Sequence, residues 1–242
     1  MTVLSVNLNK LALLRNSRGH NFPDLLKYAR RFIELGVQGL TVHPRPDERH
    51  IRRQDAINLS VLLKDFPQVE FNIEGYPSDD FLTLVKKCQP RQCTLVPDAE
   101  DQLTSDHGWD FKRHLGFLRP IISDLQAEGI RVATFLDPDP SQLERVAESG
   151  ADRIELYTES YAQAFGTSRE NERYEQYRLT ALEAQKLGLG INAGHDLNLQ
   201  NLPRFLSISG ILEVSIGHAL TIECIDQGIE TVVSRYLEIC QE

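Results

Sequence analysis

The sequence predicts an α/β fold, a (β/α)8 TIM barrel with extra helices in the loops that follow some strands. Three observations support this prediction: eight short apolar or β-branched runs recur along the chain, an amphipathic helical stretch follows each of them, and 242 residues are enough for eight such units. Strict alternation of strand and helix calls for parallel strands, and nearly continuous apolar runs are typical of strands covered on both faces. We expect a single domain over residues 1–242.

The strands are expected at residues 3–8, 39–43, 69–74, 92–96, 131–136, 153–158, 190–194 and 212–217. The helical patterns cover residues 23–35, 55–66, 81–88, 114–129, 141–150, 171–188, 201–209 and 222–239. Pro23, Asp79 and Ser141 are suitable helix starts. Glycines that could end helices in a left-handed conformation precede four strands, at Gly36, Gly129, Gly150 and Gly188.

Two intervals are longer than one helix requires, at 97–130 and 158–188, and they predict extra helices after the fourth and sixth strands. The alternative architecture is a doubly wound open sheet. It is disfavoured because no G-x-G-x-x-G follows the first strand and no P-loop lysine is present.

The amino-acid composition limits the kinds of molecule that this chain is expected to bind. The chain has 26 basic and 35 acidic residues and a formal charge of -9, which disfavours binding to nucleic acid or to anionic lipid. The four cysteines show no paired C-x-x-C spacing, so free thiols in a reducing compartment are expected. The first residues lack the pattern of a signal peptide, and no apolar run is long enough for a membrane helix. These features predict a cytoplasmic protein without a membrane partner.

In a (β/α)8 barrel the active site forms at the carboxyl ends of the strands. Polar or ionisable residues at or just beyond the predicted strand ends are Asn7, Asn9, Lys10, Arg15, Arg18, His43, Arg45, His50, Asn72, Glu74, Glu155, Tyr157, Glu159, Asn192, His195, Asp196 and His218. This polarity at one end of the barrel predicts the position of the site.

Glu74 and His43 are candidates for proton transfer. A carboxylate at the end of an apolar strand is partly desolvated, which raises its pKa toward the range of a general base or acid. A salt bridge from Glu74 to Arg45 or Lys10 is the structural alternative. His43 has an ordinary pKa of about 6.5 and can exchange protons at neutral pH. Arg45 and His50, on the following loop, suit an anionic ligand such as phosphate.

Two glycine turns, "NAGHD" at 192–196 and "SIGHAL" at 215–220, each precede a predicted helix. Glycine lets the backbone approach a ligand closely, and barrels often bind phosphate between the loops after strands 7 and 8. Tight turns without a ligand are the alternative, but the paired His195 and His218 favour a ligand. Lys10 could form a Schiff base, although phosphate contact or an ion pair is the simpler role. No H-x-H or H-E-x-x-H motif occurs, so no metal is expected.

Blocks of the sequence resemble the pyridoxine 5'-phosphate synthase family in order and over nearly the whole chain. They are "VNLNKLALLRNSRG", "GLTVHPRPDERHI", "FNIEG", "CTLVPDAEDQLTSDHGWD", "INAGHDLN" and "VSIGHAL". The resemblance implies a barrel with additional helices, a homo-octamer, and no cofactor. It also implies two small phosphorylated substrates, 3-amino-2-oxopropyl phosphate and 1-deoxy-D-xylulose 5-phosphate, which condense to pyridoxine 5'-phosphate with release of inorganic phosphate and water.

The same resemblance implies residue roles. His43 and Glu74 correspond to proton acceptors and His195 to a proton donor. The substrate-binding positions correspond to Asn7, Asn9, Lys10, Arg18, Arg45, His50, Thr104, Asp196, Gly217 and His218.

This chain departs from the family's common pattern at three places. Asn9 and Lys10 replace Asp-His, Asp196 replaces a glycine, and "YTES" at 157–160 replaces His-Thr-Gly. Asp196 has the alternative role of capping the next helix. Two other functions remain open at this level: a phosphosugar aldolase or isomerase that uses Lys10 or Glu74, and a catalytically silent phosphate-binding barrel.

Overall fold

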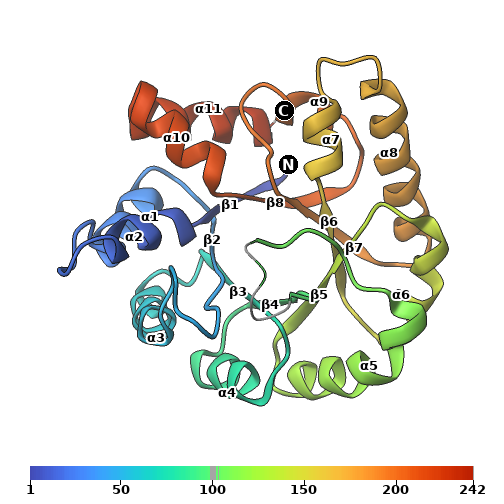
Figure 1. Ribbon diagram of the computed structural model, residues 1–242, viewed down its shortest axis with the longest axis horizontal. Helices are drawn as coiled ribbons and strands as arrows, with labels where there is room; N and C mark the ends of the chain where they lie inside the picture. The colour runs from blue at the N-terminus through green and yellow to red at the C-terminus, as the bar shows by residue number, and fades with distance from the viewer. Residues whose placement is uncertain (99–101, 103, 242) are drawn as a thin grey trace.

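Eight parallel strands close into a barrel in which each strand pairs with its neighbours in sequence and β1 pairs with β8 (Figure 1). The structure is a computed structural model that describes residues 1–98, 102 and 104–241. The strands are β1 (Val3–Asn7), β2 (Gly39–Val42), β3 (Glu70–Gly75), β4 (Gln92–Leu95), β5 (Arg131–Leu136), β6 (Arg153–Tyr157), β7 (Gly190–Gly194) and β8 (Ile211–Ile216). All eight predicted strands are confirmed.

Helices surround the barrel (Figure 1). They are α1 (Asn9–Asn16), α2 (Leu25–Glu34), α3 (Arg53–Leu62), α4 (Asp79–Cys88), α5 (Phe111–Ala127), α6 (Leu143–Ser149), α7 (Glu159–Ala164), α8 (Glu170–Lys186), α9 (Leu202–Leu206), α10 (His218–Gln227) and α11 (Ile229–Gln241), with 3-10 turns η1 (Leu63–Asp65) and η2 (Pro140–Gln142). The (β/α)8 prediction is confirmed.

The extra helices are only partly where the sequence predicted them. The helix expected after the sixth strand is present as α7. The one expected after the fourth strand is wrong for the part of 96–110 that the structure describes, where no residue is helical. That segment instead packs on the barrel, since the Trp109 indole donates to the Leu95 carbonyl over 2.9 Å. An unpredicted helix, α1, follows β1, and Gly228 at φ +86 divides the helix predicted at 222–239 into α10 and α11.

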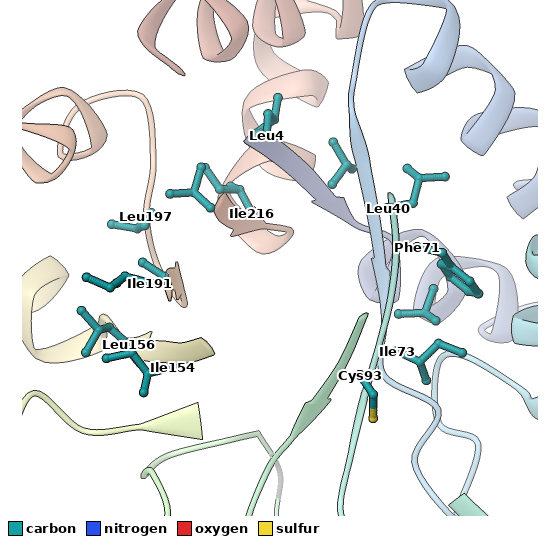
Figure 2. Packing of buried hydrophobic residues seen from close by; sticks show 14 of the residues in the cluster. Leu4, Leu40, Phe71, Ile73, Cys93, Ile154, Leu156, Ile191, Leu197 and Ile216 are labelled. Atoms are coloured by element: carbon teal, nitrogen blue, oxygen red, sulfur yellow. The ribbon is translucent and has the colours of Figure 1, made fainter. Parts of the chain in front are cut away.

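The outer face of the barrel wall is apolar. Alternate strand residues point outward and pack against the helices in one buried cluster, which includes Leu4, Leu40, Ile73, Ile154 and Ile216 (Figure 2). Burial of this ring of aliphatic side chains is what fastens the helices to the barrel.

The inner face of the barrel is more polar than the nearly continuous apolar runs of the strands predicted. Polar residues occupy alternate positions in several strands, and their side chains point into the barrel. Gln92, Asn192 and Glu213 meet across the lower part of the bore, where Asn192 Nδ2 lies 3.2 Å from Gln92 Oε1 and 3.3 Å from Glu213 Oε2. Arg131 and Arg153 approach the same carboxylate, at 3.8 and 3.5 Å. A hydrogen-bonded network of polar side chains therefore fills the interior of this barrel, whereas branched aliphatic side chains fill the interior of most (β/α)8 barrels.

Most of the predicted helix starts and ends are confirmed. Gly36, Gly129, Gly150 and Gly188 all have positive φ, between +77° and +96°. Helix α4 begins at Asp79 with the Ser78 side chain as its cap. All four cysteines are free. Within the described residues, no helix combines the length and the apolar character that crossing a bilayer requires.

Candidate active site

Glu74 and His43 lie together at the carboxyl ends of β3 and β2. The Glu74 carboxylate is 4.0 Å from Nδ1 of His43 and accepts a long hydrogen bond, 3.5 Å, from the Asn7 amide at the end of β1. Both side chains are almost fully buried. The salt bridge from Glu74 to Arg45 or Lys10 that the sequence left open is not formed; adjacent strands bring the acid, the imidazole and the amide together instead.

Burial shifts the pKa values of Glu74 and His43 in opposite directions. It raises the pKa of Glu74 well above its ordinary 4.5, and the nearby carboxylates of Glu155 and Asp98 raise it further. Burial also holds the pKa of His43 well below 6.5, helped by the positive charge of Arg45. Burial thus makes the charged form of each group less favourable, so Glu74 binds a proton more tightly than an ordinary glutamate and His43 binds one less tightly than an ordinary histidine.

A carboxylate lies beneath this pair inside the barrel. Glu155, on β6, accepts a hydrogen bond from the Thr94 hydroxyl at 3.2 Å. Burial raises the pKa of Glu155 to about 8, with a contribution from Glu213 below it, whose own pKa burial raises to about 7. These buried acids extend from the lower network toward Glu74, and the negative charges of Glu155 and Glu213 both raise its pKa.

Arg45 is buried next to His43 but is already paired. Its guanidinium forms an ion pair with Asp98, just beyond β4, and donates to the Gln102 carbonyl over 3.0 Å. Arg49 donates to the same carbonyl at 3.0 Å. The segment after β4 is thereby fastened to the segment after β2.

His50 lies beside this pair of segments, with its ring centroid 6.2 Å from that of His43. Its Nδ1 accepts a 2.9 Å hydrogen bond from the Ile51 amide. Burial lowers the pKa of His50 to about 4, with help from the positive charges of Arg45 and Lys10. His50 is therefore neutral at physiological pH, so its Nε2 can act as a hydrogen-bond donor without carrying charge.

A second group of residues forms at the end of β7. Nε2 of His195 is 3.2 Å from the Thr104 hydroxyl, and Nδ1 is 3.4 Å from the Asp196 carboxylate. The ring of Tyr157, from β6, packs edge-on against the imidazole with centroids 4.8 Å apart. The Thr158 amide donates to the Gly194 carbonyl over 3.0 Å and its hydroxyl donates to the His195 carbonyl, and these bonds hold the turn that carries the imidazole.

The ends of β1 and β8 complete the mouth. Gly217 directly follows β8 and is the N-cap of α10. A Cβ at this position would lie 2.9 Å from the Asn7 Cβ, so only glycine allows this approach. Asn9 Oδ1 accepts a 3.0 Å hydrogen bond from the His43 amide. The contact with His195 holds the pKa of Asp196 low, and the nearby side chains of His218 and Lys10 lower it further.

Not all of the residues predicted for the site lie together at the barrel mouth. Arg18 is exposed beyond α1 and makes no side-chain hydrogen bond or ion pair with a described residue. The helix predicted at 201–209 is present as α9 and begins at Leu202 with Asn201 as its N-cap, so the helix-capping role considered for Asp196 is wrong. No hydrogen bond or ion pair joins Glu74 or His43 to His195 in the part of the chain that the structure describes.

Sequence reasoning missed one member of the site. Asp98, which holds Arg45, stands two residues beyond the predicted fourth strand, so the rule that selected the other strand ends could have found it. Glu155 was noted at its strand end, but not its place under Glu74.

A cavity of about 400 Å³ opens beside the first group. His43, Arg45, Asp98 and Tyr76 are among its lining residues, and it lies between the segments that follow β2 and β3. In the described part of the chain, no group of three or more His, Cys, Asp or Glu side chains is arranged to hold a metal ion.

Solved structures similar to this one share its fold. They include 3-hexulose-6-phosphate synthase, with a TM-score of 0.64, 12% sequence identity and coverage of 98% of this chain and 99% of that chain. Phosphoribosylanthranilate isomerase from Thermotoga maritima has a TM-score of 0.56 at 14% identity, with 100% and 99% covered. At these identities the similarity concerns the barrel alone.

Relatives in sequence are far closer. The pyridoxine 5'-phosphate synthase of Brucella anthropi is 50% identical over 240 residues, which covers 97% of each chain. That of Albidiferax ferrireducens is 47% identical over 242 residues, covering 98% of this chain and 96% of the relative. The model of the family described as pyridoxal phosphate biosynthesis protein PdxJ matches residues 4–242. The resemblance drawn from the motifs is thus confirmed, and this chain belongs to the PdxJ family of pyridoxal phosphate biosynthesis proteins.

Proposed function

We propose that this chain is a transferase-type, ring-closing pyridoxine 5'-phosphate synthase. It condenses 3-amino-2-oxopropyl phosphate with 1-deoxy-D-xylulose 5-phosphate and releases inorganic phosphate and water. The observation that carries the proposal, beside the family membership, is the buried pair of Glu74 and His43, 4.0 Å apart with opposite pKa shifts at the barrel mouth. Condensation, dehydration and elimination next to a carbonyl all consist of proton transfers, which such a pair can perform.

Glu74 and His43 are assigned to proton removal. The raised pKa of Glu74 makes its carboxylate a stronger base than that of an ordinary glutamate, which favours removal of a proton from the substrate. His43 is held neutral, so its imidazole can accept a proton from a carbon acid or from an amine of the substrate. Asn7, which donates to Glu74, orients the carboxylate toward the substrate.

His195 is assigned to proton donation at departing oxygen atoms. Its Nε2 faces the Thr104 hydroxyl at the mouth, on the side of the site opposite Glu74. A substrate held between the two groups would have bases on one side and an acid on the other. This separation of roles suits a reaction that removes protons from carbon and expels hydroxyl and phosphate groups.

Phosphate recognition is assigned to the turns and the basic residues around the mouth. Gly217 and His218 open α10, whose free amides and positive dipole favour an anion. Asn9, Lys10, Arg18, Arg45, His50 and Thr104 are the further substrate contacts that we propose. Arg45 would then divide its guanidinium between substrate and Asp98. For Asp196, whose carboxylate lies beside His195, we propose a role through that imidazole instead of a contact with the substrate.

We propose a single-domain, cytoplasmic homo-octamer that needs no metal or organic cofactor. Exposed apolar side chains on α1 and α10, namely Leu13, Leu14, Ile222 and Ile225, support a subunit interface there. Sedimentation of the purified protein would give its mass and test the octamer directly.

The decisive experiment incubates the protein with both substrates and measures pyridoxine 5'-phosphate and released phosphate. Product that requires both substrates supports the proposal, and Glu74→Gln should then lower the rate by about 10²- to 10⁴-fold. Turnover of a single phosphosugar, with borohydride trapping on Lys10, would indicate an aldolase instead. Binding of both substrates without any product would indicate a silent barrel.

A further inference from the structure

Asp196 makes one side-chain contact, and that contact is with His195. Its carboxylate lies 3.4 Å from Nδ1 of the imidazole, and no other described group hydrogen bonds to it. Nδ1 is shielded from solvent and makes no hydrogen bond with a described group, so the Asp196 carboxylate at 3.4 Å is the polar group placed nearest to satisfy it. A buried ring nitrogen without an acceptor would be costly, so the carboxylate is the group that can satisfy it.

The backbone holds this pair in an uncommon conformation. His195 has φ +96 and Asp196 has φ +58, a region that favours glycine and costs other residues free energy. The turn is nonetheless rigid, because Thr158 donates to the carbonyl of His195 and the Asn201 amide donates to that of Asp196 over 3.1 Å. A carboxylate is thus kept beside His195 at a position where glycine would fit without strain.

We infer that Asp196 is a positioning residue for His195. It accepts the Nδ1 proton and so selects the tautomer whose Nε2 faces Thr104 and the barrel mouth. This inference rests on the proposed role of His195 as the proton donor.

The arrangement has a clear chemical consequence. When His195 carries two protons and the one on Nδ1 is donated to the Asp196 carboxylate 3.4 Å away, the proton on Nε2 is aimed at the barrel mouth, where Nε2 lies 3.2 Å from the Thr104 hydroxyl. Transfer of the Nε2 proton to a departing oxygen leaves a neutral imidazole that still donates from Nδ1 to Asp196. A carboxylate that orients an imidazole in this way accelerates proton transfer without touching the substrate.

The edge-on ring of Tyr157 restricts the imidazole from the other side, so the carboxylate and the phenol together define one orientation. Without the carboxylate, the imidazole should be able to rotate about its side-chain bonds, and neither tautomer should be favoured. It should leave substrate affinity almost unchanged, because the binding groups lie elsewhere.

The test compares Asp196→Gly and Asp196→Asn with the parent protein. Each is assayed with both substrates for kcat and KM, and by thermal unfolding. Asp196→Gly should lower kcat by about 10- to 100-fold, the usual effect of removing a group that orients a functional histidine, with KM within about twofold. Its unfolding temperature should stay equal or rise, because glycine relieves the strain at φ +58. Asp196→Asn keeps the shape and one acceptor oxygen, but its NH2 group can also face Nδ1, so it should recover kcat only in part and lie between the parent and Asp196→Gly.

Gln89→Gly is the matched control. Gln89 also has positive φ, +48, but it caps α4 at the opposite end of the barrel, so this change should affect stability and not kcat. The inference is overturned if Asp196→Gly keeps the parental kcat, if it raises KM alone, or if Asn and Gly lose activity equally. Absence of product from the parent protein would instead refute the proposed function.

Discussion

The buried carboxylate of Glu155 should make the protein less stable at alkaline pH, and Glu155→Gln should remove this sensitivity. Glu155 is 3% exposed, and burial raises its pKa from the ordinary 4.5 to about 8. An acid whose folded-state pKa is raised favours folding fully below its unfolded-state pKa. That contribution is lost as the pH rises through the folded-state value, because the unfolded chain ionises more easily.

The size of the effect follows from the two pKa values. A gap of about 3.5 pH units corresponds to about 5 kcal/mol once the group is ionised in both states. Part of this stabilising free energy is already lost at pH 6, because Glu155 is ionised in the unfolded chain at that pH. About 2.5 kcal/mol more is lost between pH 6 and pH 9. Glutamine resembles the protonated acid in shape and can still accept from Thr94, so the variant avoids this loss.

The assay is urea unfolding of the parent and of Glu155→Gln at pH 6 and pH 9, at one protein concentration. The variant should gain about 2.5 kcal/mol relative to the parent between the two pH values. Glu148→Gln, at an exposed position on α6, is the control and should show no such gain. An equal stability difference at both pH values would refute the assignment of the raised pKa to Glu155.

Three further predictions concern the barrel mouth. Gly217→Ala places a Cβ 2.9 Å from that of Asn7 and should cost about 1–3 kcal/mol of unfolding free energy, with reduced activity; unchanged stability and rate would contradict the close approach. Asp98→Ala leaves the buried Arg45 charge uncompensated and should cost about 3–5 kcal/mol in urea unfolding, and a loss below about 1 kcal/mol would show that the ion pair is unimportant. Since Glu74 must be ionised to act as a base and its pKa is raised, kcat/KM should fall with decreasing pH at values well above 4.5; a midpoint near 4.5 would argue against Glu74.

The strands could be predicted because they depend on local pattern. A parallel strand needs a short apolar run between turn residues, and all eight runs are visible in the sequence. The segment after the fourth strand was misjudged because its length suggested a helix. Its conformation depends instead on distant partners, such as the indole bond of Trp109 to Leu95.

The candidate site was located by one rule, that the carboxyl ends of barrel strands meet. This rule selected Glu74, His43 and His195, which the structure places at the mouth. It could not indicate that Arg45 is neutralised by Asp98, because ion pairs between loops depend on where the loops fold. Nor could it distinguish a helix cap from a histidine partner at Asp196, where backbone angles decide the direction of the side chain.

The sequence by itself therefore determined the order of strands and helices, the end of the barrel that carries the site and, through its motifs, the family. These follow from periodicity and residue type, which are local properties. Only the tertiary structure decided the protonation of Glu74, His43 and Glu155 and the choice of partner for each polar group. The physical reason is that desolvation and Coulomb interaction depend on distances in space, and residues far apart in the sequence become neighbours only when the barrel closes.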